Sequence, residues 1–272
     1  MSSTRKKSTL LADAGNTRLK WLYLTAAGIN TDEVPLNLSA EHQYAEVYTA
    51  DETPQQGALR ILHKLLVQYS PECIVFVHVL GQELTQAVST LSQQKQCELT
   101  HVSAQGSVYG IKSAYANPEH LGADRLVALV AARFFAKNCP AVIIDCGTAV
   151  TVDAVDEDGQ HLGGVILPGL NLLSDVLIRR TQARHMAASV FEHPTVFADN
   201  TIQAIGSGCL YTLVGAIEGI CQRMQQKMSE KPVNIICGGD AAQVHALFSD
   251  KGNFRLEPAA LMTGLWVIAG QS

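Results

Sequence analysis

Two polar turns interrupt apolar segments of this sequence, about half the chain length apart. The first turn reads Asp13-Ala14-Gly15-Asn16-Thr17, and the second reads Asp145-Cys146-Gly147-Thr148-Ala149. Glycine lets backbone N–H groups approach an anion because no Cβ atom intervenes, and amide and hydroxyl side chains add further donors. The residue types therefore predict two similar turns that bind phosphate.

The acidic residues of these turns carry a second implication. A carboxylate repels phosphate unless a cation lies between them, so Asp13 implies a magnesium ion held partly through water. Arg18 and Lys20 follow in the next apolar segment. If this segment is a strand, the two side chains point to the same face and could meet phosphate charge. Alternatively, Asp13 and Asp145 are ordinary turn acids. The presence of both turns favours a clamp on a nucleoside triphosphate.

A third polar segment, "YANPEHLGADR" at residues 115–125, lies between the two turns. Its end opens an amphipathic helix, expected over residues 123–137. Asp124 can accept the proton of an attacking hydroxyl in phosphoryl transfer, or it can cap the helix and face its dipole. Arg125 can pair with a substrate carboxylate or form a surface ion pair. The residue types alone leave these alternatives open.

Two glycine-rich segments follow, "GGVILPGL" at residues 163–170 and "CGGDA" at residues 237–241. The Gly238-Gly239 pair would let a flat group such as adenine lie against the backbone, although many glycine pairs only make tight turns.

Composition narrows the class of protein. The 272 residues are 47% hydrophobic and 17% charged, which is enough for a large core. A net charge of −5 with scattered basic residues argues against nucleic-acid binding. No apolar run of membrane length and no signal peptide is apparent, so we expect a cytoplasmic protein without membrane contact. The seven cysteines lack Cys-x-x-Cys spacing and are expected to be reduced.

Strands alternate with helices in the expected secondary structure, which indicates an α/β protein. Strands are expected at residues 9–13, 18–24, 73–79, 141–145, 149–155, 162–167 and 233–237, and a further helix is expected at residues 57–69. The sequence similarity of the two turns suggests duplication of one βββαβα unit, with a cleft between the halves. The alternative is chance recurrence of a short motif.

Six motifs together resemble the type III pantothenate kinase family of the superfamily that contains acetate and sugar kinases, heat-shock chaperone ATPases and actin. They are "DAGNTRLK", "YANPEHLGADR", "DCGTAVTVD", "GGVILPG", "NTIQAIGSG" and "CGGDA". The resemblance implies two actin-like (ribonuclease H-like) domains around a nucleotide cleft. It also implies transfer of the ATP γ-phosphate to the 4′ hydroxyl of pantothenate, the first step of coenzyme A synthesis.

The resemblance assigns roles to individual residues. ATP would be bound by Asp13, Ala14, Gly15, Asn16, Thr17, Arg18, Lys20, Gly147, Thr148, Gly238 and Gly239. Pantothenate would be bound by Tyr115, Gly122, Ala123, Asp124, Arg125 and Thr201, with Asp124 as the proton acceptor. Asp145 would help hold a monovalent cation, K⁺ or NH₄⁺, and Mg²⁺ would accompany ATP near Asp13. A homodimer is also implied.

Some segments lie outside the resemblance, and some residues also suit a purely structural role. The leader at residues 1–8 is extra and expected to be disordered, followed by domains at 9–121 and 122–272, and residues 28–72 match no motif. Thr201 also suits a helix cap, and Tyr115 also suits packing. The rival functions are a kinase or phosphatase of the same fold with another substrate, and a nucleotide-binding regulator or accessory factor without catalysis.

Overall fold

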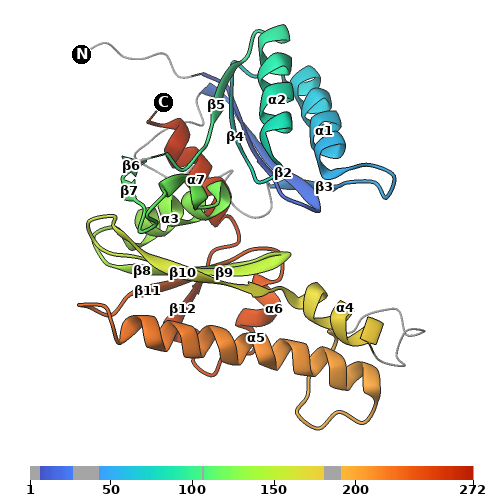
Figure 1. Cartoon of the computed structure of the whole chain (residues 1–272), viewed down its shortest axis with the longest axis vertical. Helices are drawn as coiled ribbons and strands as arrows, with labels where there is room; N and C mark the ends of the chain where they lie inside the picture. Colours follow the sequence, from blue (N-terminus) through green and yellow to red (C-terminus); the bar gives the residue numbers. More distant parts are fainter. Residues whose placement is uncertain (1–6, 27–42, 106, 181–190, 272) are drawn as a thin grey trace. The chain divides into compact units, whose positions relative to one another are not determined.

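The computed structural model describes residues 7–26, 43–105, 107–180 and 191–271 (Figure 1). It divides into two compact units, the first made of residues 1–137, 158–161 and 259–272, and the second of residues 138–157 and 162–258. Residues 1–6 of the expected leader lie outside the described part. The other two leader residues are held, because Lys7 pairs with Glu98 and the Ser8 N–H donates to Glu72 Oε2 at 3.0 Å.

The described part of the first unit contains a five-stranded sheet with helices. Its elements are β1 (Thr9–Ala14), β2 (Arg18–Leu24), β3 (Tyr44–Val47), α1 (Pro54–Tyr69), β4 (Cys73–His78), α2 (Gln82–Gln94), β5 (Glu98–His101), β6 (Ser107–Val108), β7 (Ile111–Lys112), η4 (Pro118–His120), α3 (Ala123–Ala136) and α7 (Ala260–Ala269). The strand order is β3-β2-β1-β4-β5.

The second unit repeats this order. Its elements are β8 (Ala141–Cys146), β9 (Ala149–Val155), β10 (His161–Pro168), α4 (Leu170–Arg180), α5 (Thr201–Gln225), β11 (Val233–Cys237), α6 (Ala241–His245), η6 (Lys251–Asn253) and β12 (Phe254–Leu256). The strand order is β10-β9-β8-β11-β12. In each unit the first strand lies in the middle of the sheet: β1 is antiparallel to β2 and parallel to β4, and β8 is antiparallel to β9 and parallel to β11. The predicted duplication is confirmed in the sheet topology.

The boundary between the units differs from the expected position. The sequence placed α3 in the second domain, after residue 121, whereas the first unit continues to residue 137 and also includes α7. The physical reason is packing: α3 and α7 lie against each other and against β4, and a Cβ at Gly264 would overlap the Val127 carbonyl oxygen. The absence of a side chain at Gly264 permits this close approach.

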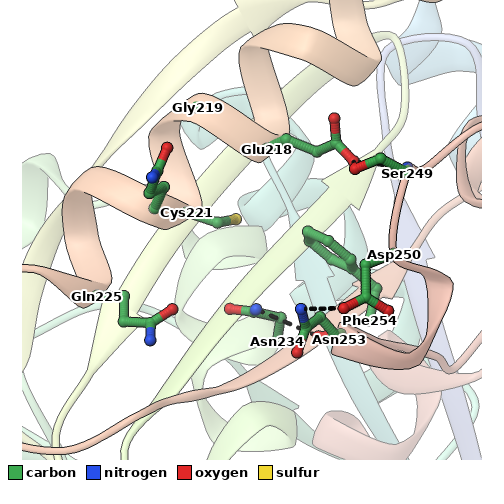
Figure 2. A pocket seen from close by; sticks show the side chains of 10 residues that line it. Glu218, Gly219, Cys221, Gln225, Asn234, Ser249, Asp250, Asn253 and Phe254 are labelled. Carbon is green, nitrogen blue, oxygen red and sulfur yellow. Dashed lines mark hydrogen bonds between the residues drawn. The ribbon is translucent and has the colours of Figure 1, made fainter.

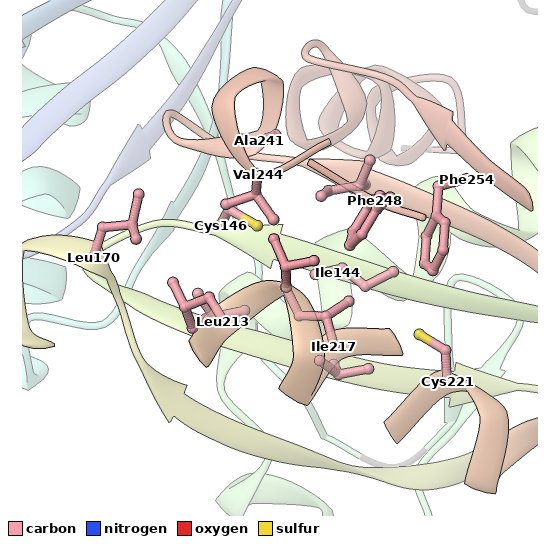
Figure 3. Close-up of a cluster of buried hydrophobic side chains, with 14 of the residues drawn as sticks. Ile144, Cys146, Leu170, Leu213, Ile217, Cys221, Ala241, Val244, Phe248 and Phe254 are labelled. Carbon is pink, nitrogen blue, oxygen red and sulfur yellow. The ribbon is translucent and has the colours of Figure 1, made fainter. Parts of the chain in front are cut away.

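Each sheet has one face covered by a hydrophobic core. In the first unit, Leu10, Ala12 and Ala14 of β1 pack with residues of α1 and α2. Leu11 and Asp13 alternate with them and point to the opposite face, against which α7 packs. In the second unit, the equivalent core joins alternate residues of β8 to α5 and α6, as Figure 3 shows for Ile144, Cys146 and Ile217. Asp145 therefore points away from α5, as Asp13 points away from α1.

Local signals explain where α1 begins and ends. Thr53 accepts a hydrogen bond from the Gln56 N–H, and the Gln56 side chain accepts one from the Thr53 N–H, which completes a capping box. Pro54 fits the first turn, and Ser70 ends the helix in the left-handed conformation at φ 44°.

The sequence analysis expected no helix of membrane length, but α5 is long and apolar enough to cross a membrane by length and composition. In the structure, α5 supplies Leu210, Leu213 and Ile217 to the core of the second unit. Burial of this face accounts for the apolar composition without a membrane.

Candidate active site

The first polar turn is a closed loop between β1 and β2. The Gly15 N–H donates to the Arg18 carbonyl at 3.1 Å, and Asn16, Thr17 and Arg18 are exposed. Asp13 is paired in register with Lys20, and Lys20 Nζ lies 3.9 Å from Asp13 Oδ2. The turn therefore combines exposed donors with a buried carboxylate beside a lysine, which is an arrangement suited to phosphate and a cation.

Tyr48, in the segment that matched no motif, holds this turn. Its hydroxyl donates to the Gly15 carbonyl at 3.1 Å, and its N–H donates to the Thr17 carbonyl at 3.2 Å. A Cβ at Gly57 of α1 would lie 2.5 Å from the Tyr48 ring, so glycine makes room for the ring. Burial raises the pKa of Tyr48, and the charge of Asp13 raises it further, which keeps the hydroxyl a donor.

Asp124 lies in the first turn of α3. Its Oδ1 accepts a hydrogen bond from the Arg125 N–H at 2.8 Å, whereas Gly122 is the N-cap residue and provides no side-chain cap. A Cβ at Gly122 would lie 2.5 Å from Asp124 Oδ1, so any other residue at this position would displace that oxygen. Asp124 is thus an acidic residue in the first turn, where the positive end of the helix dipole interacts favourably with a carboxylate.

Arg125 and Tyr115 form a pair beside Asp124. Arg125 is only 5% exposed, which rules out the surface ion pair considered from the sequence. Its Nη1 donates to the Tyr115 hydroxyl at 2.7 Å, and its guanidinium carbon lies 5.6 Å from the centre of the Tyr115 ring. The structure therefore brings Tyr115, Gly122, Ala123, Asp124 and Arg125 together at the start of α3.

His161 is a further member of this cluster that sequence reasoning missed. It is fully buried, its ring centre lies 6.0 Å from that of Tyr115, and its Nδ1 faces the Ala114 N–H at 3.5 Å. Nothing in its sequence surroundings marks it, because Ala114 and Tyr115 lie more than forty positions away in the chain.

The second polar turn is one residue shorter than the first. The Gly147 N–H donates to the Ala149 carbonyl at 3.1 Å, and Thr148 is exposed. The Gly169 N–H donates to the Thr148 carbonyl at 3.1 Å, and a Cβ at Gly169 would lie 2.6 Å from that oxygen. Gly169, from the "LPG" segment, therefore supports the second turn through a contact that no larger residue permits.

Gly238 begins the glycine pair directly after β11 and lies beside Asp145. It has φ +100°, and a Cβ there would lie 2.5 Å from Asp145 Oδ1 and would also overlap the Cys146 carbonyl oxygen. The space above Gly238 thus meets two oxygen atoms, a donor set that suits a hard cation. Gly239 is exposed and has open space where a side chain would lie.

Thr201 is the first residue of α5 and is exposed. The cap of this helix is Asn200, whose Oδ1 accepts from the Gln203 N–H at 3.0 Å. The alternative prediction that Thr201 caps the helix is therefore wrong, because Asn200 is the cap. Thr201 belongs to the second unit, whereas Tyr115 and Asp124 belong to the first.

Within the described residues, no group of three or more His, Cys, Asp or Glu side chains is placed to hold a metal ion. A dedicated protein cage for magnesium is therefore not present there. Single carboxylates such as Asp13 fit a magnesium ion that takes most of its ligands from water and phosphate. All seven cysteines are free thiols, as expected.

The repeated sheet order and the two acidic glycine turns define the class as an actin-like α/β protein, and this confirms the expected fold. EutJ from Carboxydothermus hydrogenoformans is similar with a TM-score of 0.58 and 11% identity, covering 96% of this chain and 89% of that one. MreB 5 of Spiroplasma citri, solved with AMPPNP, is similar with a TM-score of 0.53 and 10% identity, covering 98% and 96%.

Sequence relatives identify the family within this class. The profile of the type III pantothenate kinase family matches residues 9–223. Type III pantothenate kinase from Herminiimonas arsenicoxydans is 32% identical over 239 residues, 87% of this chain and 88% of that protein. The one from Dichelobacter nodosus (strain VCS1703A) is 30% identical over 259 residues, 94% and 96% of the two chains. The chain belongs to the type III pantothenate kinase family.

Proposed function

We propose that this chain is an ATP-dependent kinase that transfers the γ-phosphate to the 4′ hydroxyl of pantothenate, the first step of coenzyme A synthesis. The observation that carries the proposal is the family match over residues 9–223, which includes both polar turns and Asp124. The two relatives, at 32% and 30% identity, are also described as type III pantothenate kinases, and the match covers most of their length.

The first turn, with Asp13, Ala14, Gly15, Asn16, Thr17, Arg18 and Lys20, binds phosphate oxygens of ATP in this proposal. The side chains of Asn16, Thr17 and Arg18 are exposed donors. Gly15 carries no side chain beside them, and Lys20 adds a positive charge. In the second turn Thr148 supplies an exposed hydroxyl, and Gly147 carries no side chain beside it. Gly239, which follows Gly238, has open space where a side chain would lie and leaves backbone accessible to adenine. Magnesium neutralises phosphate charge when it is bound with ATP.

The cluster at the start of α3 binds the acceptor. Pantothenate has a carboxylate, and Arg125 supplies a buried positive charge whose position is held by the Tyr115 hydroxyl. Asp124 orients the 4′ hydroxyl and accepts its proton as the new O–P bond forms and the bond to ADP breaks. Thr201 adds a hydroxyl from the N-terminus of α5 as a further substrate contact.

Asp145 helps hold a monovalent cation, K⁺ or NH₄⁺. The support is the pair of oxygen atoms around the space above Gly238, because such cations bind carboxylate and carbonyl oxygens. The cation adds positive charge beside the second turn, where phosphate charge develops.

A homodimer is proposed from the surface of the second unit. β10 is an edge strand of its sheet, and exposed apolar residues lie on it and on the following α4. They are Leu162, Val165, Ile166, Leu172, Val176 and Leu177. An apolar patch next to an open sheet edge is typical of a protein interface. We also propose that the enzyme works in the cytoplasm, since free thiols persist in a reducing compartment.

The decisive experiment measures ADP formation by the purified protein with ATP, magnesium and pantothenate, with and without K⁺ or NH₄⁺, and identifies 4′-phosphopantothenate by mass. Product that requires pantothenate and increases with the monovalent cation supports the proposal. ATP binding without phosphorylation of pantothenate would favour a nucleotide-binding regulator, and turnover with another acceptor would favour a different kinase.

A further inference from the structure

The second unit contains a pocket at the end of its sheet opposite to the second turn. It has a volume of about 360 Å³ and is lined by residues of α5, the start of β11, the loop after α6 and the start of β12 (Figure 2). Asn234 lines the pocket near the start of β11, whereas Gly238 follows the end of the same strand. The pocket is therefore separate from the residues proposed for ATP and pantothenate.

Asn234 has an unsatisfied hydrogen-bond acceptor in this pocket. The residue is 7% exposed, and its Nδ2 donates to the Asn253 carbonyl at 3.2 Å. Its Oδ1 is buried and has no hydrogen-bond partner among the described residues. In Figure 2 the oxygen end of Asn234 points away from Asn253. A buried acceptor is unfavourable unless a donor reaches it, so the pocket needs an occupant that carries N–H or O–H groups.

The charge of the lining restricts the kind of occupant. Its two ionisable carboxylates are Glu218 and Asp250, and none of the ten lining residues is cationic. Both carboxylates are fixed, because Glu218 Oε1 accepts from the Ser249 N–H at 2.8 Å and Asp250 Oδ2 accepts from Asn253 Nδ2 at 2.6 Å. Two cations lie just outside the lining, because Lys231 Nζ donates to Asn253 Oδ1 at 2.8 Å and Arg223 Nη1 donates to the Gly219 carbonyl at 2.7 Å. The charged side chains of the lining itself are both carboxylates, which favour a cation over an anion.

The lining also has an apolar part. Phe254 and Cys221 are buried and contribute a ring and a thiol, and burial raises the pKa of Cys221 to about 12, so the thiol is neutral. The carbon atoms of an organic cation can contact this apolar wall, which a bare metal ion cannot use. The volume lies within the range of small-molecule sites.

We propose that this pocket binds a small organic cation with a primary ammonium or guanidinium group and a short carbon chain. An N–H of the cation donates to Asn234 Oδ1, the carboxylates of Glu218 and Asp250 balance its charge, and its carbon chain contacts Phe254. This site is additional to the proposed kinase site and does not depend on it.

The experiment compares three probes of equal chain length with the full-length protein: butylammonium, butan-1-ol and butyrate. Binding is followed by calorimetry and by amide chemical shifts, with the Gly219 N–H and the Asn234 side-chain NH₂ as reporters. We expect butylammonium to shift both reporters, and we expect butyrate to shift neither. Butan-1-ol should bind at least tenfold more weakly than butylammonium because it carries no charge.

Two variants locate the binding. Glu218→Gln keeps an acceptor for Ser249 but removes the charge, and we expect at least a fivefold loss of butylammonium affinity. The matched control is Glu230→Gln, which makes the same charge change at an exposed residue outside the lining and should alter affinity less than twofold. Asn234→Leu removes the acceptor at similar volume and should weaken binding at least tenfold.

Three results would overturn the proposal: no shift with butylammonium, which would mean that water alone occupies the pocket; equal shifts with all three probes; or equal losses in Glu218→Gln and Glu230→Gln. If Asn234→Leu fails to fold, the comparison of the two glutamate variants still decides the question.

Discussion

The Tyr48 hydroxyl donates a hydrogen bond to the Gly15 carbonyl at 3.1 Å, so a residue of the segment after β3 fixes the first polar turn. The Tyr48 ring rests on Gly57 of α1, which ties the turn to the helical layer beneath it. A preorganised turn binds an anion without losing conformational entropy at that moment.

Tyr48→Phe is therefore expected to raise the KM for ATP about threefold to tenfold, the effect of one hydrogen bond, with kcat changed less than twofold. Steady-state kinetics with varied ATP checks this. The control is Tyr44→Phe, the same change at an exposed tyrosine of the same strand region, which should leave both constants unchanged. Equal KM values for Tyr48→Phe and the parent would contradict the positioning role.

Asp124→Asn is expected to lower kcat by about 10²-fold to 10⁴-fold, because the amide cannot accept the proton of the attacking hydroxyl. The affinity for ATP should be retained, as measured by calorimetry with a non-hydrolysable analogue. Glu119→Gln, on the exposed η4 turn nearby, is the control with the same chemical change. Unchanged turnover in a folded Asp124→Asn protein would refute the assignment.

Asp145→Asn is expected to weaken activation by potassium, since one oxygen loses its charge in the proposed cation site. The measurement is initial rate against KCl concentration at constant ionic strength, where the half-activating concentration should rise about tenfold. Glu157→Gln, an exposed acid after β9, should leave the curve unchanged. An identical potassium response in Asp145→Asn would exclude the cation role.

Gly169→Ala is expected to displace the second turn, because the added Cβ would lie 2.6 Å from the Thr148 carbonyl oxygen. We expect weaker ATP binding by about tenfold, the result of losing about 1.4 kcal/mol of donor contacts. Gly208→Ala in α5 places the same methyl group in open space and should bind ATP normally. The idea fails if both variants bind ATP equally well.

His78 is expected to make stability depend on pH. Its Nδ1 accepts from the Leu80 N–H at 3.1 Å, so the neutral form is required, and burial and the neighbouring His101 lower its pKa from 6.5 to about 4. The unfolded chain then binds more protons, so the free energy of unfolding falls as pH falls from about 6.5 to about 4. The loss from this residue is about 1–3 kcal/mol.

Urea unfolding at pH 7, 6 and 5 tests this prediction. His78→Asn keeps an acceptor for the Leu80 N–H and should flatten the pH dependence in that range. His63→Asn, at an exposed position of α1, should keep the parental slope. A His78 resonance that titrates near its ordinary pKa would contradict the expectation directly.

Much of the fold was predictable because local sequence patterns determine many of its strands and helices. The seven strands expected from β-branched and apolar runs are present as β1, β2, β4, β8, β9, β10 and β11, and the expected helices correspond to α1 and α3. Each has its own periodicity and end signals, which act between near neighbours in the chain. The sequence analysis did not expect the short strands β3, β5, β6, β7 and β12, since two to four residues carry little periodic pattern.

The types and order of the candidate site residues also came from the sequence alone. An acidic residue, a glycine and a hydroxyl residue in one turn indicate phosphate and cation binding. The repetition of this set indicated the duplication that the sheet order shows. Tertiary structure decided what those residues contact. Tyr48 reaches Gly15, His161 approaches Tyr115, and Gly169 supports Thr148 only because distant segments fold together. Such contacts depend on packing and backbone approach, which no local pattern in the chain records.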